Sequence, residues 1–377
     1  GVAEALYNQQ QRTFYGNFAA KGGLSPLTKV AASSYAGGEA KLAQHMGVDK
    51  SQLQDLFDWV IGKDIDDDNQ NNSHSDKRRD LLGDPLHSKP LAIDFGLSAK
   101  NPDIRILLGS NHGMLHMFQD KGDSVNESWA FMPWEFLPNL ATLRANVPSG
   151  VHSVYGFDGS PAAYIKRSGN KMEKAWVFMG LRRGGRGYYA MDVTNPDKPS
   201  LMWHISADSA GMSELGQSWA KPVVTTIPGQ GDKPVLIFRA GYSPAKDTLE
   251  VGGADSQGRG VFILDAETGK LLHRFGPGGD TPMPGLRDSI PNSVAILDSN
   301  GDGVTDRIYA TDTGANVWRL DMAGADSKQW SAFKFASLGG STENTDRRFF
   351  AAPVVAQTMF GNLSENRVTV NGQSKMV

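Results

Sequence analysis

The sequence contains AWVFMG at residues 175–180 and, after a Gly-rich turn, GYYAMD at residues 187–192. Two short runs of apolar, aromatic and β-branched residues on either side of a turn predict a β-hairpin. The same arrangement recurs three more times, in the paired runs 104–109 and 113–118, 235–241 and 260–265, and 306–311 and 314–321. A unit that repeats at long intervals indicates a fold built from neighbouring copies of that unit.

Further runs with strand character flank each hairpin. Pro-led apolar runs precede the four hairpins, at residues 89–93, 160–165, 221–224 and 290–296. Runs with an aromatic residue follow the first three, at residues 128–131, 201–205 and 270–275. Four strands per unit predict an all-β fold, a modified β-propeller of four-stranded blades, and a fifth unit starts at residues 352–356. A β-sandwich is the competing architecture, but sandwiches need no such self-similarity.

The first 80 residues follow a different pattern. Within residues 49–61, Leu53, Leu56, Phe57 and Val60 recur three or four apart, which places them on one face of a helix. The polar stretch 63–80 that follows indicates a loop. We therefore expect a helical segment and an acidic loop over residues 1–80. The β-propeller is expected over residues 81–377, with a truncated C-terminal end.

Composition excludes several kinds of site. The 377 residues include no cysteine, which excludes disulfides, thiol nucleophiles, iron–sulfur clusters and cysteine zinc sites. A net charge of -3 gives no general attraction to nucleic acid or anionic membranes. No apolar run is long enough to predict a transmembrane segment. Because no Gly-x-Ser-x-Gly or other conventional catalytic set occurs, we expect no catalytic residues and no enzyme.

The most informative stretch for function is DSNGDGVTD at residues 298–306. Counted from Asp298, oxygen side chains fall at positions 1, 3, 5 and 9, and a glycine falls at position 6, where a sharp turn is required. The predicted calcium ligands are Asp298, Asn300, Asp302, Asp306 and the backbone carbonyl of Val304. Oxygen-only ligation selects calcium over zinc. Position 12 is Tyr309 rather than the Glu of an EF-hand, so the loop is predicted to join two strands.

A second acidic loop follows the predicted helix. Its oxygen ligands in the same spacing are Asp64, Asp66, Asp68, Asn72 and the Gln70 carbonyl. Asn69 stands at position 6, where the first loop has glycine, and Asn tolerates a left-handed turn less well. The stretch is therefore either a second calcium site or a solvated acidic linker.

Two further motifs have structural interpretations. His112 and His116 are four residues apart, as in a helical metal pair, but the surrounding pattern is that of strands, so a structural role is expected. Residues 182–187 (RRGGRG) form a basic, Gly-rich hairpin tip. Phosphate binding there lacks the strand-to-helix transition of a phosphate cradle, so we expect an exposed turn.

Together these features resemble the C-terminal propeller domain of the PilY/PilC family of type IV pilus biogenesis factors. The most specific stretches are DWVIGKD at residues 58–64, the acidic run, and LGDPLHSKP at residues 82–90, which is similar to the family's Gly-Asp-x-x-His-Ser-x-Pro element before the first blade. The blade hairpins and the 298–306 loop also agree, so the resemblance extends over nearly the whole chain from about residue 50.

The resemblance implies a location and partners. It implies a protein of a Gram-negative bacterium that is associated with the cell surface or the pilus, or secreted across the outer membrane. It further implies roles in pilus assembly, in opposing retraction, in twitching motility and in adhesion, with calcium occupancy as the control. The expected partners are pilins, especially minor pilins, and the surface of a host cell.

Two alternatives remain open. Residues 260–270 are similar to blades of pyrroloquinoline-quinone dehydrogenases, but those enzymes often carry a vicinal cysteine pair that this chain lacks. The other alternative is a plain propeller scaffold, similar to integrin α-chain propellers, in which the calcium ion only fastens a hairpin.

Overall fold

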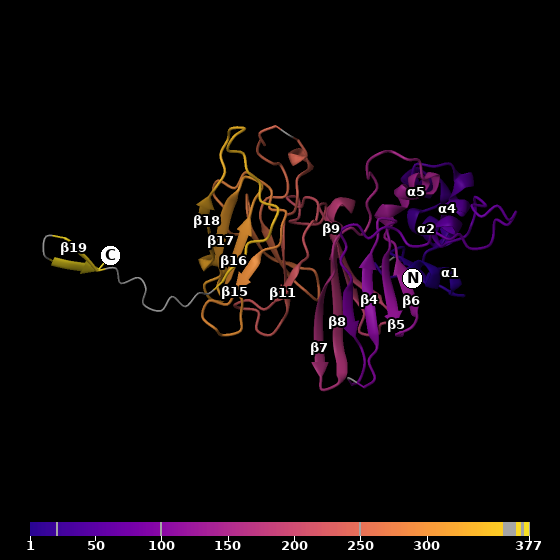
Figure 1. The fold of residues 1–377 in the computed structure, drawn as a ribbon, viewed down its shortest axis with the longest axis horizontal. Helices are drawn as coiled ribbons and strands as arrows, with labels where there is room; N and C mark the ends of the chain where they lie inside the picture. The colour runs from indigo at the N-terminus through magenta and orange to yellow at the C-terminus, as the bar shows by residue number, and fades with distance from the viewer. Residues whose placement is uncertain (20–21, 99, 249, 357–366, 371–372, 377) are drawn as a thin grey trace.

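The fold consists of consecutive antiparallel sheets that follow one another along the chain (Figure 1). The structure is a computed structural model and describes residues 1–19, 22–98, 100–248, 250–356, 367–370 and 373–376. Four of its sheets contain meanders of four strands in chain order. This confirms the predicted all-β propeller of four-stranded blades.

The blades alternate with longer connections. Blade 1 consists of β3 (Leu91–Asp94), β4 (Ile104–Gly109), β5 (Leu115–Asp120) and β6 (Val125–Phe131). Blade 2 consists of β7 (Ala162–Ser168), β8 (Lys171–Gly180), β9 (Gly187–Asp192) and β10 (Ser200–Ser206). Blade 3 consists of β11 (Val223–Thr225), β12 (Val235–Arg239), β13 (Val261–Asp265) and β14 (Leu271–Phe275). Blade 4 consists of β15 (Ala295–Leu297), β16 (Arg307–Thr311), β17 (Asn316–Asp321) and β18 (Ser331–Ser337).

The start of a fifth blade at residues 352–356 is not formed. These residues adopt no strand, and Val354 is 91% exposed. A strand needs a hydrogen-bonded neighbour, and no described residue pairs with this run. Further along, β19 (Arg367–Val370) and β20 (Gln373–Met376) pair with each other.

The N-terminal segment is mainly helical. It contains α1 (Val2–Asn8), α2 (Lys29–Ala36), α3 (Glu39–Met46), the short 3-10 helix η1 (Lys50–Gln52) and α4 (Leu53–Val60). The face predicted from the apolar spacing is buried in α4. After blade 1, η2 (Trp134–Asn139) and α5 (Leu140–Ala145) pack against these helices (Figure 1).

One part of the segment expected to be helical is a strand. β1 (Phe14–Gly16) pairs in parallel with β6 and antiparallel with β2 (Ser25–Pro26), so the first sheet has six strands. The carbonyls of Thr13 and Tyr15 accept the amides of Ala130 and Met132 at 2.9 and 2.8 Å. Without β1, this edge of β6 would have unpaired backbone N–H and C=O groups. Pairing with them favours a strand over a helix at residues 14–16.

The apolar core lies between neighbouring blades. Along β12, Leu236 and Phe238 pack toward blade 2, whereas Val235 and Ile237 pack toward blade 4. A strand that is buried on both faces has a continuous apolar sequence, which explains the pattern of the central strands.

The turns of the blades lie on two opposite faces of the propeller. Because each blade is a meander, the turns after its first strand lie on one face, and the turns after its second strand lie on the other. In Figure 1 the β7–β8 turn marks the lower face. Among the described residues, no helix is long and apolar enough to cross a membrane.

Candidate metal centre

The loop at residues 298–306 joins two strands, as predicted. It connects β15 to β16, and the Asp306 amide donates to the carbonyl of Leu297 at 3.1 Å, which closes the loop at its base. Its tip is exposed, whereas Thr305 at the base is buried. The sequence spacing therefore places all five predicted ligands on one short hairpin loop.

Asp298 organises the first half of this loop. Its carboxylate accepts the amides of Gly301 and Gly303 at 2.7 Å and that of Asp302 at 3.2 Å. These hydrogen bonds, that of Gly303 foremost, hold the pKa of Asp298 below its ordinary value. Gly301 and Gly303 have φ angles of 80° and 86°, in the left-handed region that favours glycine.

The other predicted ligand side chains bind donors of the same loop. Asp302 accepts the Val304 amide at 2.8 Å, and Asn300 accepts the Asp302 amide at 3.0 Å. Asp306 accepts the Ser299 amide and hydroxyl at 3.0 and 2.7 Å. In this arrangement no group of three or more His, Cys, Asp or Glu side chains among the described residues is close enough to hold an ion.

The set of ligand oxygens nevertheless fits a calcium ion in type, and a bidentate carboxylate and water would complete the roughly six to eight oxygens that calcium takes. A carboxylate has about four lone-pair sites, so the three amide bonds of Asp298 leave acceptor capacity for a cation. The oxygens are all hard, and their positions follow the spacing of calcium loops. To bind the ion, the carboxylates of Asp302 and Asp306 would have to turn away from the N–H and O–H groups of the loop that now donate to them.

The base of the loop is fastened to blade 3, which the sequence did not predict. The Thr305 amide donates to the carbonyl of Thr226 at 2.9 Å, and the hydroxyls of Thr305 and Thr225 lie 2.7 Å apart. A groove of about 540 Å³ beside the tip is lined by Asp302, Asp306 and Asp321, among others. The base of the loop is therefore anchored to a neighbouring blade, and its tip borders an open surface.

The acidic loop at residues 64–72 is similar to the first loop at Asp64 but differs from it at Asp66. Asp64 is buried and accepts the amides of Asp68 and Asn69 at 2.9 and 3.4 Å, as Asp298 does in the first loop. Asp66, however, forms a two-pronged ion pair with Arg144 of α5 at 2.7 and 2.9 Å. The hydrogen bond from Arg144 lowers the pKa of Asp66 and occupies the carboxylate.

The turn of this loop also falls at other positions. Positive φ angles occur at Asp67, Gln70 and Asn72 (52°, 57° and 62°) and not at Asn69, the position of the glycine in the first loop. The Asp76 carboxylate, missed by the spacing, accepts the side-chain amides of Asn69 and Asn71 at 2.9 Å. Its other oxygen is buried and has no hydrogen-bond partner among the described residues, so a cation could satisfy it.

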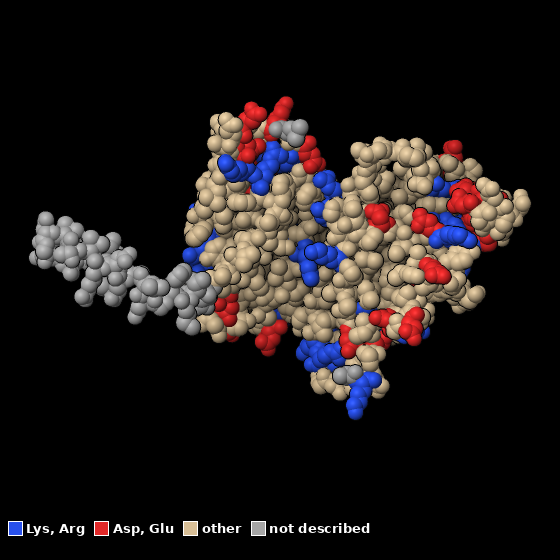
Figure 2. Space-filling model, in the orientation of Figure 1, with Lys and Arg blue, Asp and Glu red and all other residues tan. Residues whose placement is uncertain are grey.

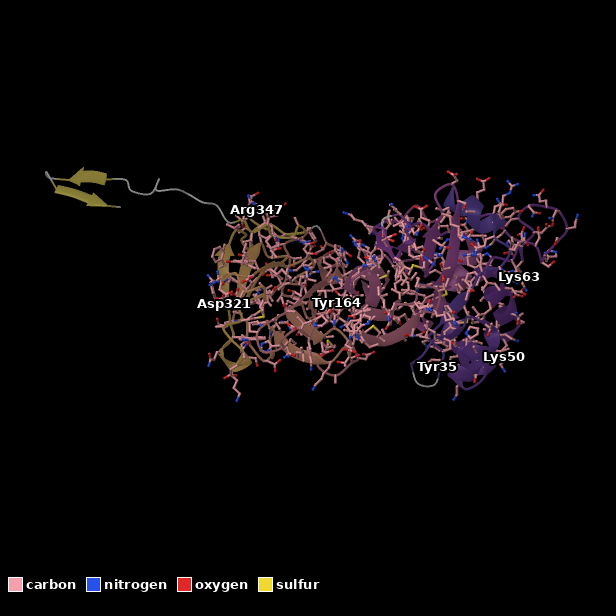
Figure 3. The ribbon with its side chains drawn as sticks, turned by 90° about the horizontal axis from the view of Figure 1, so that it is seen from below. Tyr35, Lys50, Lys63, Tyr164, Asp321 and Arg347 are labelled. Atoms are coloured by element: carbon pink, nitrogen blue, oxygen red, sulfur yellow. The ribbon has the colours of Figure 1, made fainter. Side chains whose placement is uncertain are left out.

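The two loops lie at opposite ends of the molecule. Lys63, next to Asp64, and Asp321, beside the 298–306 loop, are labelled near the two ends in Figure 3. Acidic side chains gather over the end that carries α4 and α5 (Figure 2). Ions in the two loops would therefore be separate sites.

The structure agrees with the role expected for His116 but not with the exposed turn expected at residues 182–187. His116 is buried and forms a 2.7 Å hydrogen bond with Glu127, a structural contact, and no metal cluster is formed by the described residues. The turn at residues 182–187 is not simply exposed. The side chains of Arg182 and Arg183 are only 20% and 30% exposed, because the turn is pressed against residues 156–158.

Comparison with known proteins supports the resemblance. A family model described as the PilY1 beta-propeller domain matches residues 75–361. The type IV pilus biogenesis factor PilY1 of Pseudomonas aeruginosa (strain PAO1) is 30% identical over 306 residues, which cover 74% of this chain and 24% of that protein. A PilY1 homolog of Xylella fastidiosa is 30% identical over 247 residues, 62% of this chain and 15% of that protein.

A solved structure of the same family is also similar. The crystal structure of the Pseudomonas aeruginosa PilY1 C-terminal domain aligns with a TM-score of 0.47 and 27% identity, over 67% of this chain and 49% of that chain. The chain spans about a quarter of the length of the Pseudomonas relative. With the family model covering most of the residues that form the four blades, the chain belongs to the PilY1 β-propeller family of type IV pilus biogenesis factors.

Proposed function

We propose that this chain is a calcium-binding, non-enzymatic part of a type IV pilus biogenesis factor at the bacterial surface. In this proposal the protein promotes pilus assembly, opposes retraction and supports twitching motility and adhesion through contacts with pilins, including minor pilins. Membership of the family supports the pilus role, and its relatives are named as biogenesis factors rather than enzymes. The single observation that supports the calcium role is the hairpin loop 298–306, in which backbone amides hold the carboxylate oxygens in place.

Five groups of the loop would hold the ion: the side chains of Asp298, Asn300, Asp302 and Asp306, and the carbonyl of Val304. Calcium, when bound, would supply two positive charges that offset most of the negative charge of the three carboxylates, Asp298, Asp302 and Asp306. The amides of Gly301 and Gly303 already orient Asp298. The remaining step is the inward rotation of Asp302 and Asp306, which would release Ser299 and reshape the neighbouring groove.

A purely structural calcium ion is the second candidate. The bonds of Thr305 to Thr225 and Thr226 favour it, because they attach the loop to blade 3 in the absence of any partner. In that case the ion would stabilise the contact between blades without regulating the pilus. The acidic loop at residues 64–72 is a further candidate site, with Asp76 as an added ligand.

Calorimetric titration with calcium tests the first step. We expect Asp302→Asn to weaken calcium binding at least about 10-fold, because one of three carboxylates loses its charge. The matched control is Asp232→Asn, which changes an exposed carboxylate in the β11–β12 turn, the equivalent turn of blade 3. Unchanged binding in Asp302→Asn would exclude the loop. A second equivalent of calcium that Asp76→Asn removes would assign a site to residues 64–76.

Pilus counts and motility assays test the second step. A strain carrying Asp302→Asn in a folded protein is expected to have fewer pili and reduced twitching compared with the Asp232→Asn strain. If calcium binding is lost while pilus number and motility stay normal, the ion has only a structural role.

A further inference from the structure

A second concave site lies away from both acidic loops. It is a pocket of about 490 Å³, formed where the β8–β9 turn, the segment before β11, the β12–β13 connection and the segment before β15 meet. These elements lie on the face opposite to the β15–β16 loop. Four cationic side chains and one carboxylate line the pocket: Arg182, Arg183, Lys221, Lys246 and Asp247. A concave site with converging charged groups is a candidate ligand site.

An aromatic pair holds the two arginines in place. The guanidinium carbons of Arg182 and Arg183 lie 4.5 and 4.9 Å from the centroid of the Trp219 ring. Tyr242 packs against Trp219, with ring centroids 4.0 Å apart and the two planes tilted by 31°. Such stacking fixes a guanidinium while its N–H groups stay free at the edges.

The turn that carries the arginines is held under strain. Arg182 has a φ angle of 53°, in the left-handed region that is unfavourable for a residue other than glycine. A side chain at Gly184 would clash with the carbonyl of Gly156, so the turn is packed directly on that segment. The buried carboxylate of Asp158 accepts an N–H of Arg182 at 3.1 Å from behind. The surrounding structure therefore holds the side chains of Arg182 and Arg183 close to the Trp219 ring at the wall of the pocket.

Hydrogen bonding divides the cations into two kinds. The Lys246 ammonium is buried, donates to Asp288 at 2.7 Å and to a backbone carbonyl at 2.6 Å, and lies 3.7 Å from Asp255, so its charge is already balanced within the protein. Arg183 has only a 3.6 Å ion pair with Asp247 among the described residues. Lys221 is exposed and, within the same part of the chain, has no carboxylate partner. Arg183 and Lys221 are thus the groups open to a ligand.

We propose that this pocket binds a carboxylate group of an acidic peptide segment. The planar fork of Arg183 suits the two oxygens of a carboxylate, and Lys221 adds a second, mobile donor. The volume exceeds that of a bare ion, and the apolar side chains of Pro291 and Phe350 in the wall give a peptide further contacts. Binding of this kind uses side chains rather than a helix N-terminus, so it does not require a phosphate cradle at residues 182–187.

Fluorescence anisotropy with a labelled hexaglutamate peptide tests the proposal, with hexaglutamine as the neutral peptide. Arg183→Gln is expected to weaken hexaglutamate binding about 10-fold, since a charge-assisted hydrogen bond corresponds to roughly that factor. Lys221→Gln should weaken it about 3-fold. The control is Lys233→Gln, an exposed lysine of the β11–β12 turn outside the pocket, which should leave binding unchanged. Thermal unfolding confirms that each variant is folded.

Three results would overturn the assignment: equal affinity of Arg183→Gln and the unsubstituted protein, equal affinity of the neutral peptide, or binding of inorganic phosphate without binding of hexaglutamate. Because the pocket and the 298–306 loop lie on opposite faces, peptide binding should persist when calcium is removed with a chelator. A failure of the calcium proposal would therefore leave this result unchanged.

Discussion

Replacing Arg12 with alanine should release the N-terminal segment from blade 1. The guanidinium of Arg12 donates to both oxygens of Glu127 at 2.7 and 3.0 Å, and His116 forms a 2.7 Å hydrogen bond with the same carboxylate. The side chains of Arg12 and Glu127 are 5% and 0% exposed. Without Arg12, the Glu127 carboxylate would still be removed from water, and only His116 would remain to stabilise its charge.

The size of the effect follows from this burial. Removing one partner of a buried ion pair costs about 3–5 kcal/mol. The lower end applies here, because His116 remains as a partner. Since every 1.4 kcal/mol is a factor of ten, a loss of about 3 kcal/mol should increase opening of this contact roughly 100-fold.

Native-state hydrogen exchange measures this opening. The amides of Ala130 and Met132, which donate to the β1 strand region, should exchange roughly 100-fold faster in Arg12→Ala, while amides in blade 4 keep their rates. The matched control is Arg79→Ala, which removes an exposed arginine of the same N-terminal part. Unchanged exchange at these two amides would refute the idea that the buried pair fastens the segment.

The same pair gives a pH dependence. Burial raises the pKa of Glu127, but the hydrogen bonds and charges of His116 and Arg12 outweigh it and hold the pKa below its ordinary value of 4.5. Because the native pKa is the lower one, the unfolded chain binds more protons in acid. The stabilisation from this group is therefore complete above pH 4.5 and is lost as the pH falls further.

Three other predictions concern single positions. Gly303→Ala and Gly285→Ala place a side chain at φ angles of 86° and 78° in open space, so each should cost about 1 kcal/mol in thermal unfolding, but only the first should weaken calcium binding. Asp312→Ala leaves the buried indole N–H of Trp318 without its 2.7 Å acceptor and should cost about 3 kcal/mol in urea denaturation; a loss below about 1 kcal/mol would contradict the bond's role. Burial lowers the pKa of His204 to about 4, so its NMR signals should show no titration near pH 6.5, and stability should fall as the pH drops below 6.5 because the unfolded state then binds more protons.

The blades could be predicted because their signals are local. Residues 104–109 and 187–192 coincide with β4 and β9, and the other central runs differ from the observed strands by a few residues at their ends. Buried central strands have continuous apolar runs, and the outer ones have at least a proline or an aromatic residue. β18 was not predicted although it contains Phe333 and Phe335, and most of its residues, including both phenylalanines, are exposed.

The missed elements depend on distant partners. Phe14–Gly16 become β1 only because β6 has a free edge more than a hundred residues away in sequence. In the same way, the Arg144 that occupies Asp66 lies on α5, and the spacing of the acidic loop contains no information about it. The 298–306 hairpin loop could be predicted because its oxygen side chains, its glycine turns and its hydrogen bonds all lie within nine consecutive residues.

The connection between the 298–306 loop and blade 3 determines how far a bound ion could change the structure. Rotation of Asp306 toward an ion would release Ser299 but would leave the Met322 amide bound to the Asp306 carbonyl at 2.8 Å and Thr305 bound to Thr226. The base of the loop is thus fixed in either state, and the change is confined to the tip and the adjoining groove. A calcium-dependent partner should therefore contact that groove, whereas a ligand of the arginine pocket on the opposite face should bind equally well with and without the ion.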